Sequence, residues 1–429
     1  MKYVFFILTQ LCFSCKNSGK DVLITPEKIV LGNNLDIEIN GLVPNTKYDV
    51  YLQQLLYDTS IVNLSKAIFM SDSGGLVDID KSESLGGDFL GRDSLGLFYI
   101  LDTVSKLPSF LNDIRIGSIY DINKINYSLQ IVKDQKIIKK KEFSFIIKGV
   151  DVQHKRIEKN TIILDLYTTN NKNEITIVLG GSEGNNKVSN YIAKVLASNG
   201  HNAAAISYFG NSKQGYSLKN VPLERIDTSL MLINKTIREF DRINIVGVSR
   251  GAELALLYAS YRDEIHSVFA FAPSSVVFSG HLFHNIPAWT LESKAFDYIN
   301  FPNSLKSEFD ADNKPIYVSH ISKALEKHKS NPEIPVENIN ANVYLFSGKD
   351  DLLWPSAQMA DMIEQRISNS SFNKEFVNFK LDSVGHSVLS PAYMSTKSYS
   401  YSALGGNRKA NSYANLKYWN FLLKKLNSK

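Results

Sequence analysis

Apolar and polar residues alternate in short runs along the first third of the chain. In Leu35-Asp36-Ile37-Glu38-Ile39 and in Tyr48-Asp49-Val50-Tyr51-Leu52, every second residue is apolar. This period of two is typical of strands with one buried face. Turn residues separate the runs, and no stretch sustains the spacing of a helix. The pattern from Asp21 to about Lys148 therefore predicts a small β-sandwich.

The pattern changes after a polar, charged junction at residues 151–160. Beyond it, runs that are apolar on both faces alternate with segments of helical spacing, which is typical of a parallel sheet covered by helices. The alternation stops between Ser274 and about Pro335, where an insertion commonly covers an active site. We expect strands at Ile175–Leu179, Ala203–Tyr208, Ile243–Gly247, Val268–Phe271, Val343–Ser347 and Phe376–Leu381, and helices around Tyr191–Asn199, Asp227–Phe240 and Gln358–Ile367.

Length and composition fit a division into two domains. A chain of 429 residues exceeds what one hydrophobic core usually serves, and 44% apolar with 21% charged residues is an ordinary globular composition. We predict an all-β sandwich over residues 21–150 and an α/β domain with a mostly parallel sheet over residues 151–429, its covering segment spanning about 275–335. The net charge of +5 is spread along the chain, so no nucleic-acid partner is expected.

Residues 1–20 resemble a secretory leader. The apolar stretch from Tyr3 to Phe13 is too short to span a bilayer as a mature helix. Both cysteines, Cys12 and Cys15, lie here, so the mature body cannot hold an intrachain disulfide. Cys15 resembles a lipoprotein acceptor, and we expect an exported protein attached to a membrane of a bacterial envelope through lipidated Cys15. Plain secretion after cleavage and a buried N-terminal anchor are the alternatives.

The motif Gly247-Val248-Ser249-Arg250-Gly251 lies between an apolar strand pattern and a helical pattern that runs from Ala252 to Ser260. A serine in this context of strand, turn and helix is a nucleophile elbow. Its hydroxyl is held above the sheet, where a base can deprotonate it and backbone N–H groups can face an incoming carbonyl. Ser249 is therefore the candidate nucleophile for acyl transfer.

A serine nucleophile needs a base and an orienting acid, which follow the elbow in the chain order acid, then histidine. Asp350 and Asp351 come directly after an apolar strand. We choose Asp351 from its offset within the loop, and Asp350 is the alternative. His386 follows the last strand and is the expected general base. The order of strands and catalytic residues fits an α/β-hydrolase.

The oxyanion formed during attack needs two donors. The backbone N–H of Arg250 is one by construction of the elbow. The second is expected from the glycine loop at residues 179–184, at Gly181 or Ser182. This loop lacks the lysine of a P-loop and the spacing of a dinucleotide fingerprint, so no phosphate site is expected there. The sequence gives no evidence for a metal or a cofactor.

The covering segment carries three candidates for substrate contact, Trp289, His281 and His284. Both histidines precede the acid in the chain, which argues against a catalytic role, and surface or packing roles are the alternative. His201 is expected to shape a turn before a strand. The other histidines lie in polar surroundings and receive no role.

Several stretches in both halves match one known family: Asp72–Asp78, Leu85–Gly91, Leu179–Gly184, Tyr208–Gly210, Gly247–Leu254, Ser274–Gly280, Gly348–Ser356 and Gly405–Gly406. Through them the chain resembles the acyl-CoA thioesterase and bile acid-CoA:amino acid N-acyltransferase family. The resemblance implies an immunoglobulin-like sandwich before an α/β-hydrolase domain, with Ser249, Asp351 and His386 as the triad. It also implies hydrolysis, because members that conjugate an amine tend to use cysteine as the nucleophile.

We therefore expect a serine acyl hydrolase of the acyl-CoA thioesterase type, acting on a small-molecule acyl thioester or ester. Coenzyme A thioesters are cytosolic metabolites, so another acyl ester, thioester or amide is an open alternative for an exported enzyme. A peptidase or amidase and an acyltransferase would use the same triad. A catalytically inactive surface binding protein is the alternative from another class.

Overall fold

The computed structural model describes residues 22–55, 62–104, 108, 111, 123–169, 173–237, 240–280, 286–301, 317–327, 332–386, 389–396 and 404–428. The leader with Cys12 and Cys15 lies outside the described residues, as do His281 and His284.

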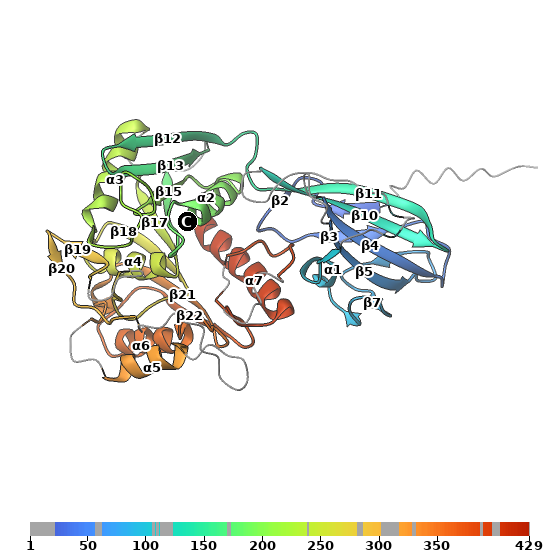
Figure 1. The fold of residues 1–429 in the computed structure, drawn as a ribbon. Coiled ribbons are helices and arrows are strands. Elements are labelled where there is room, and N and C mark those ends of the chain that lie inside the picture. Colours follow the sequence, from blue (N-terminus) through green and yellow to red (C-terminus); the bar gives the residue numbers. More distant parts are fainter. Residues whose placement is uncertain are drawn as a thin grey trace, which may run out of the picture.

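The N-terminal part is built almost entirely of strands, shown in blue to cyan in Figure 1. Its elements are β1 (Val22–Thr25), β2 (Ile29–Val30), β3 (Asp36–Ile39), β4 (Lys47–Leu55), β5 (Val62–Met70), β6 (Val77–Asp78), β7 (Glu83–Ser84), β8 (Gly91–Arg92), α1 (Gly96–Tyr99), β9 (Asp102–Val104), β10 (Lys124–Lys133) and β11 (Lys136–Ile146). One sheet has the order β1-β3-β6 and a second has the order β2-β11-β10-β4-β5-β9.

The two sheets share one apolar core. Ile37 and Val77 from the three-stranded sheet and Val50 and Leu129 from the six-stranded sheet belong to the same buried cluster. In β3 the two isoleucines are buried while the acidic residues between and before them are not, as the period of two predicts. The strand-rich organisation of this part is thus as expected. Its classification as immunoglobulin-like stays a prediction.

The C-terminal part contains an eight-stranded sheet with helices on both faces. Its elements are β12 (Gln153–Lys159), β13 (Ile162–Thr168), β14 (Glu174–Leu179), α2 (Lys187–Ser198), β15 (Ala203–Ser207), β16 (Val221–Pro222), α3 (Glu224–Thr236), β17 (Arg242–Val248), α4 (Arg250–Ala259), β18 (Ile265–Phe271), β19 (Trp289–Leu291), β20 (Lys294–Ala295), α5 (Tyr317–Lys327), the 3-10 helix η1 (Val336–Asn338), β21 (Asn342–Gly348), α6 (Ser356–Ser368), β22 (Phe376–Leu381) and α7 (Arg408–Asn427).

The strand order is β12-β13-β15-β14-β17-β18-β21-β22. Only the pairs β12 with β13 and β13 with β15 are antiparallel, and all later neighbours are parallel. This order, with the third and fourth strands exchanged, is that of α/β-hydrolases. The loops after β14, β17, β21 and β22 therefore meet at one edge of the sheet, where ligands of open α/β sheets bind.

The helices cover the two faces of this sheet as separate layers. Buried residues of α2 and α7 join one apolar cluster, and those of α3, α4 and α6 join the other. All six central strands expected from the sequence are present, and the expected helices begin a few residues earlier than predicted. Helix α7 was not predicted, because polar Asn411, Ser412 and Asn415 are among its buried residues.

The predicted polar junction at residues 151–160 is wrong in part. Residues Gln153–Lys159 form the edge strand β12, which pairs along its whole length with β13. Its residues are almost all exposed, so it lacks the apolar positions from which strands are recognised. Charged side chains on an edge strand also discourage pairing with other chains.

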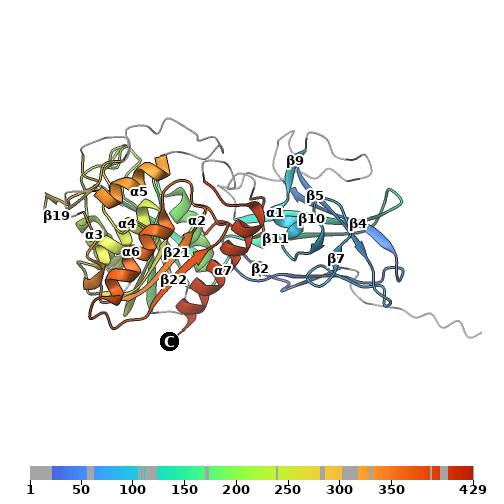
Figure 2. The ribbon, with the colours of Figure 1, turned by 90° about the horizontal axis from the view of Figure 1, so that it is seen from below.

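Helix α7 lies between the large sheet and the strand-rich part, as Figures 1 and 2 both show. The guanidinium of Arg408, at its start, donates to the carbonyls of Tyr99 and Leu101 at 2.9 and 2.8 Å. Lys409 forms an ion pair with buried Asp93 at 2.8 Å. The two parts of the chain are thus joined through polar contacts as well as through a shared apolar cluster.

Candidate active site

Ser249 occupies the turn between β17 and α4 with φ 56° and ψ −118°, a conformation that residues with a side chain rarely adopt. Such strain persists only where the surrounding structure enforces it. A Cβ atom at Gly247 would lie 2.3 Å from the carbonyl oxygen of Gly251, and one at Gly251 would lie 2.2 Å from that of Gly180. Close backbone approach therefore requires both glycines of the motif.

Two successive hydrogen bonds join Ser249, His386 and Asp351. The Nε2 atom of His386 lies 3.0 Å from the Ser249 Oγ atom, and its Nδ1 atom lies 2.9 Å from Oδ2 of Asp351. All three residues are buried, with 5–8% of their surface exposed. In this arrangement the imidazole can take the hydroxyl proton while the carboxylate holds its other nitrogen.

The Asp351 carboxylate is fixed by its own loop. Its Oδ1 atom accepts hydrogen bonds from the N–H groups of Leu353 and Trp354, at 2.9 and 3.2 Å, and its Oδ2 atom accepts one from the Ser356 hydroxyl at 2.6 Å. Asp350, the alternative acid, is exposed. The structure thus places Asp351, rather than its neighbour, against the histidine.

The acid and base loops are held together by the segment before α7. Asp351 forms a bridge with Gly405, and the His386 N–H donates to the Leu404 carbonyl at 2.7 Å. A Cβ atom at Gly405 would lie 1.8 Å from the Asp350 carbonyl oxygen. This close approach explains the glycine pair that the sequence shows at this place.

The candidate oxyanion donors flank Ser249. Arg250 opens α4, where backbone N–H groups have no partner within the helix. The glycine loop lies beside the elbow because β14 and β17 are neighbours, and a Cβ atom at Gly181 would lie 3.4 Å from the Ser249 Cβ atom. The roles of Arg250, Gly181 and Ser182 as donors stay predictions.

The side chain of Arg250, to which sequence reasoning gave no role, is buried. Its guanidinium donates to Glu253 at 2.8 Å and to the carbonyls of Phe278 and Ser279 at 3.2 and 3.1 Å. The indole N–H of Trp289 also donates to Glu253, at 2.6 Å. Desolvation raises the pKa of Glu253 to about 7, although Arg250 and Trp289 favour its charged form. This cluster ties α4 to the covering segment.

The expectation that Trp289 contacts the substrate receives no support from the geometry. Trp289 has no exposed surface, and its ring packs 5.6 Å from the Tyr208 ring and beneath the Arg250 guanidinium. Tryptophan is suited both to packing and to substrate contact. The sequence alone therefore does not distinguish these two roles for Trp289.

The covering segment packs directly against the triad loops. Phe278 stacks on Phe301, with ring centroids 4.7 Å apart, and on Trp354 at 5.7 Å. The Trp354 ring in turn meets the His386 imidazole edge-on at 5.9 Å. The segment therefore adjoins the histidine, as expected for a cover.

Two other histidines are paired with carboxylates away from this edge. His201 precedes β15, at the opposite end of the parallel strands, and its Nδ1 atom lies 2.8 Å from Glu174. His154 on the edge strand lies 2.9 Å from Asp165. These contacts are structural, and neither histidine competes with His386 for Ser249.

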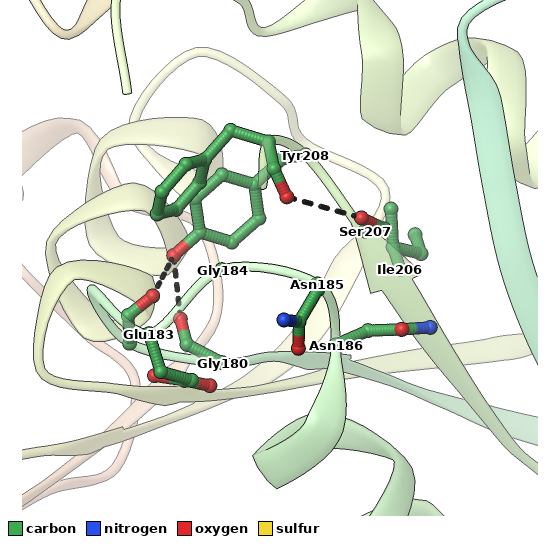
Figure 3. A pocket seen from close by; sticks show the side chains of 10 residues that line it. Gly180, Glu183, Gly184, Asn185, Asn186, Ile206, Ser207 and Tyr208 are labelled. Carbon is green, nitrogen blue, oxygen red and sulfur yellow. Dashed lines mark hydrogen bonds between the residues drawn. The ribbon is translucent and has the colours of Figure 1, made fainter. Parts of the chain in front are cut away.

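A small pocket is lined in part by the glycine loop (Figure 3). Its free volume of about 10 Å³ is room for roughly one water molecule. Tyr208 and Glu183 line it together with the loop. Sequence reasoning assigned neither residue a role, although Tyr208 stands in one of the stretches shared with the family.

Among the described residues, no group of three or more histidine, cysteine or acidic side chains is arranged to hold a metal ion. Within the same residues, no helix has the length and hydropathy required to cross a bilayer.

Some solved structures match part of the chain at low identity. A putative dienelactone hydrolase from Klebsiella pneumoniae matches 64% of this chain and 97% of its own length, with 13% identity and a TM-score of 0.39. An esterase from Pyrococcus furiosus matches 54% of this chain and 84% of its own, with 15% identity and a TM-score of 0.35.

One sequence relative matches almost the whole chain. The human protein named acyl-coenzyme A thioesterase 6 is 22% identical over 415 residues, which is 92% of this chain and 94% of that protein. The mouse protein named acyl-coenzyme A amino acid N-acyltransferase 1 is 23% identical over 258 residues, 57% of this chain. The matched region spans only 59% of that relative's length.

Two family models match the chain. Residues 32–159 match the acyl-CoA thioester hydrolase/BAAT N-terminal region, and residues 231–428 match the BAAT / acyl-CoA thioester hydrolase C terminal region. Together they cover most of the strand-rich part and the section of the α/β part that carries Ser249, Asp351 and His386. The chain therefore belongs to the family of acyl-CoA thioester hydrolases and bile acid-CoA:amino acid N-acyltransferases.

Proposed function

We propose that this protein is a serine acyl hydrolase that cleaves acyl thioesters or esters through Ser249, His386 and Asp351. One observation carries the proposal: the hydroxyl, imidazole and carboxylate are joined by hydrogen bonds of 3.0 and 2.9 Å at the ligand-binding edge of the sheet. Family membership supports the substrate class, since thioesterases are among the named relatives.

In the proposed reaction, the Ser249 Oγ atom attacks the acyl carbonyl carbon while the His386 Nε2 atom takes the hydroxyl proton. Asp351 holds the imidazole in place and stabilises its charged form. Backbone N–H groups at Arg250 and in the glycine loop stabilise the oxyanion. The tetrahedral intermediate then collapses, the bond to the leaving group breaks, and His386 returns the proton to the departing sulfur or oxygen.

Deacylation repeats these steps with water. His386 takes a proton from the water as its oxygen attacks the acyl-enzyme carbonyl, and then returns that proton to Ser249 as the carboxylic acid leaves. No further group is needed to balance either half of the reaction.

Acyl transfer to an amino acid is a second candidate, favoured by the names of several relatives. It would follow the same acyl-enzyme, with an amine replacing water in the second step. The serine nucleophile at position 249 supports hydrolysis within this family, by resemblance to its hydrolytic members.

Export and lipidation of Cys15 remain part of the proposal on sequence grounds alone. If the enzyme is exported, its substrate is an acyl compound met outside the cytosol, and the family's coenzyme A thioesters become the less fitting choice.

Turnover of a matched substrate panel tests the proposed function. Purified protein is offered an acyl-CoA, an aryl ester and a peptide amide with the same acyl chain, with and without an added amino acid, and the products are identified by mass spectrometry. We expect free acid from the thioester or the ester, and none from Ser249→Ala. Release only from the amide would make the enzyme a peptidase or amidase, and an acyl–amino acid product would make it a transferase.

A further inference from the structure

Tyr208 contacts the glycine loop through its phenol. It follows β15 at the carboxyl edge of the sheet and is buried, with 4% of its surface exposed. Its phenolic oxygen lies 2.6 Å from the carbonyl oxygen of Gly180 and 3.0 Å from that of Gly181 (Figure 3). The single phenolic O–H is therefore within donating distance of two successive carbonyls.

These contacts fix the direction of two N–H groups. In a trans peptide unit the C=O and N–H bonds point in opposite directions. The carbonyl of Gly180 shares its peptide unit with the N–H of Gly181, and the carbonyl of Gly181 shares its unit with the N–H of Ser182. Because Tyr208 holds both carbonyls on its own side, both N–H groups point away from Tyr208.

Glu183 distinguishes between these two N–H groups. A Cβ atom at Gly180 would lie 2.5 Å from one carboxylate oxygen of Glu183, and one at Gly181 would lie 3.0 Å from the other, so the carboxylate folds back over the loop. Burial raises the pKa of Glu183, and its own backbone N–H, followed by those of Gly181 and Val188, opposes this rise by favouring the charged carboxylate. Among the described residues, neither the Gly181 N–H nor the Ser182 N–H donates to a backbone carbonyl, so the proximity of the Glu183 carboxylate to Gly181 is what separates the two groups.

The surroundings of Tyr208 keep its phenol in place. Its ring packs against Phe209 and Trp289, with centroids 5.2 and 5.6 Å away, and Arg225 donates to its backbone carbonyl. Burial raises the pKa of Tyr208 well above its ordinary value, so the phenol stays protonated and remains a donor at neutral pH.

We propose that Tyr208 is a positioning residue for the oxyanion site: its phenol orients the glycine-loop peptides so that the Ser182 N–H, rather than that of Gly181, faces the oxyanion formed at Ser249. The inference rests on the proposed function, since it assigns the second donor of that reaction. It selects Ser182 from the two positions that the sequence left open.

Tyr208→Phe tests the proposal, because the ring and its packing remain while the hydroxyl is lost. Loss of one oxyanion donor typically lowers kcat about 10²- to 10³-fold, and a loosened donor should cost about 10- to 100-fold. We expect kcat to fall by that factor with KM changed less than about twofold. The inhibition constant of a trifluoromethyl ketone, whose adduct carries an oxyanion, should rise by a similar factor.

Tyr48→Phe is the matched control. Tyr48 in β4 is also buried, and its phenolic oxygen accepts a hydrogen bond from the Val43 N–H at 3.0 Å, in the strand-rich part. It should show a comparable change in melting temperature with unchanged kcat. If Tyr208→Phe keeps wild-type kcat and inhibitor affinity while its melting temperature falls like the control, Tyr208 serves packing only and the proposal is wrong.

Glu183→Gln provides a second variant if Tyr208→Phe does not fold. The amide keeps one oxygen that can face the Gly181 N–H, so at saturating substrate the variant should retain more than about a third of wild-type kcat, whereas Glu183→Ala should lose at least about tenfold. Equal activity of both variants would overturn the assignment of Ser182. Absence of any turnover by the wild-type enzyme would instead contradict the proposed function itself.

Discussion

The phenol of Tyr127, in the strand-rich part, donates to the backbone carbonyl of Tyr393 at 2.6 Å, and Tyr393 lies in the segment that follows His386. The Tyr393 phenol in turn accepts a hydrogen bond from the Leu35 N–H at 2.9 Å, and its ring stacks on Phe145 with centroids 4.9 Å apart. The strand-rich part thus supports the chain that carries the candidate base.

Tyr393→Phe should destabilise the protein without altering its chemistry. The change leaves the buried Leu35 N–H without its acceptor, and an unsatisfied buried donor costs about 1–3 kcal/mol. Urea denaturation followed by fluorescence should show a lower midpoint at unchanged slope, with kcat per folded molecule retained. An unchanged midpoint would show that the contact between the two parts contributes no stability.

Asp351→Asn should nearly abolish turnover while Asp350→Asn should not. The amide can hold the imidazole only in the wrong tautomer, a change that lowers kcat on the order of 10⁴-fold in triads of this kind. Asp350 is exposed, so its amide variant should stay within about twofold of wild type. The kcat values of the two neighbours, measured side by side, decide which acid serves the histidine, and the reverse ranking would exclude Asp351.

Gly251→Ala should disrupt the site. The new methyl group would lie 2.2 Å from the Gly180 carbonyl oxygen and 2.3 Å from that of Leu179, so the elbow or the glycine loop must shift. We expect a loss of at least about 100-fold in kcat/KM, since a misplaced catalytic geometry costs about that much. Gly74→Ala, in an exposed turn of the strand-rich part, is the control. Retained activity in Gly251→Ala would show that the loop tolerates the displacement.

Glu253 should make stability depend on pH. Its pKa is about 7 in the folded protein, above the ordinary value, so the folded state binds its proton more tightly than the unfolded state does. The stability it contributes is fully present below about pH 4.5 and is lost as the pH rises through 7, on the order of 3 kcal/mol in all. Glu253→Gln lacks this loss.

The measurement for Glu253 is the free energy of unfolding of wild type and Glu253→Gln at pH 5 and at pH 8. As the pH rises from 5 to 8, the free energy of unfolding of wild type should fall relative to that of Glu253→Gln. A difference that is independent of pH would contradict the argument, because it would mean that Glu253 ionises with its ordinary pKa.

The sequence predicts those parts of the site that depend on a short local motif. The elbow around Ser249, the acid after a strand and Gly385-His386 each require particular residues at fixed spacings, so each is visible without coordinates. The contacts of Tyr208 and Glu253 join elements that are distant in the sequence. No residue spacing predicts such contacts. The proposed choice of Ser182 over Gly181 rests on the direction of peptide units, which only the folded chain determines.

The elements of the fold likewise divide into those with a local sequence pattern and those without one. Central strands that are buried on both faces read as continuous apolar runs and were found from the sequence. Edge strand β12 carries charged residues on exposed positions, and α7 buries asparagines and serines, so neither has the apolar period on which such predictions depend.

Lipidation of Cys15 is tested in cells. Metabolic labelling with an alkyne fatty acid should mark the wild-type protein and leave Cys15→Ala unmarked, with the variant released from the membrane fraction. Equal labelling of both forms, or recovery of the wild type in the cytosol, would remove the lipoprotein hypothesis.

The central claim is that Ser249 is a nucleophile activated by His386. Its most direct test is mass spectrometry of the native protein after reaction with a fluorophosphonate. We predict a single adduct on Ser249 in the wild type, none in Ser249→Ala, and labelling slowed by at least about 100-fold in His386→Ala. A folded wild-type protein whose Ser249 stays unmodified, or reacts equally fast without His386, would contradict the account.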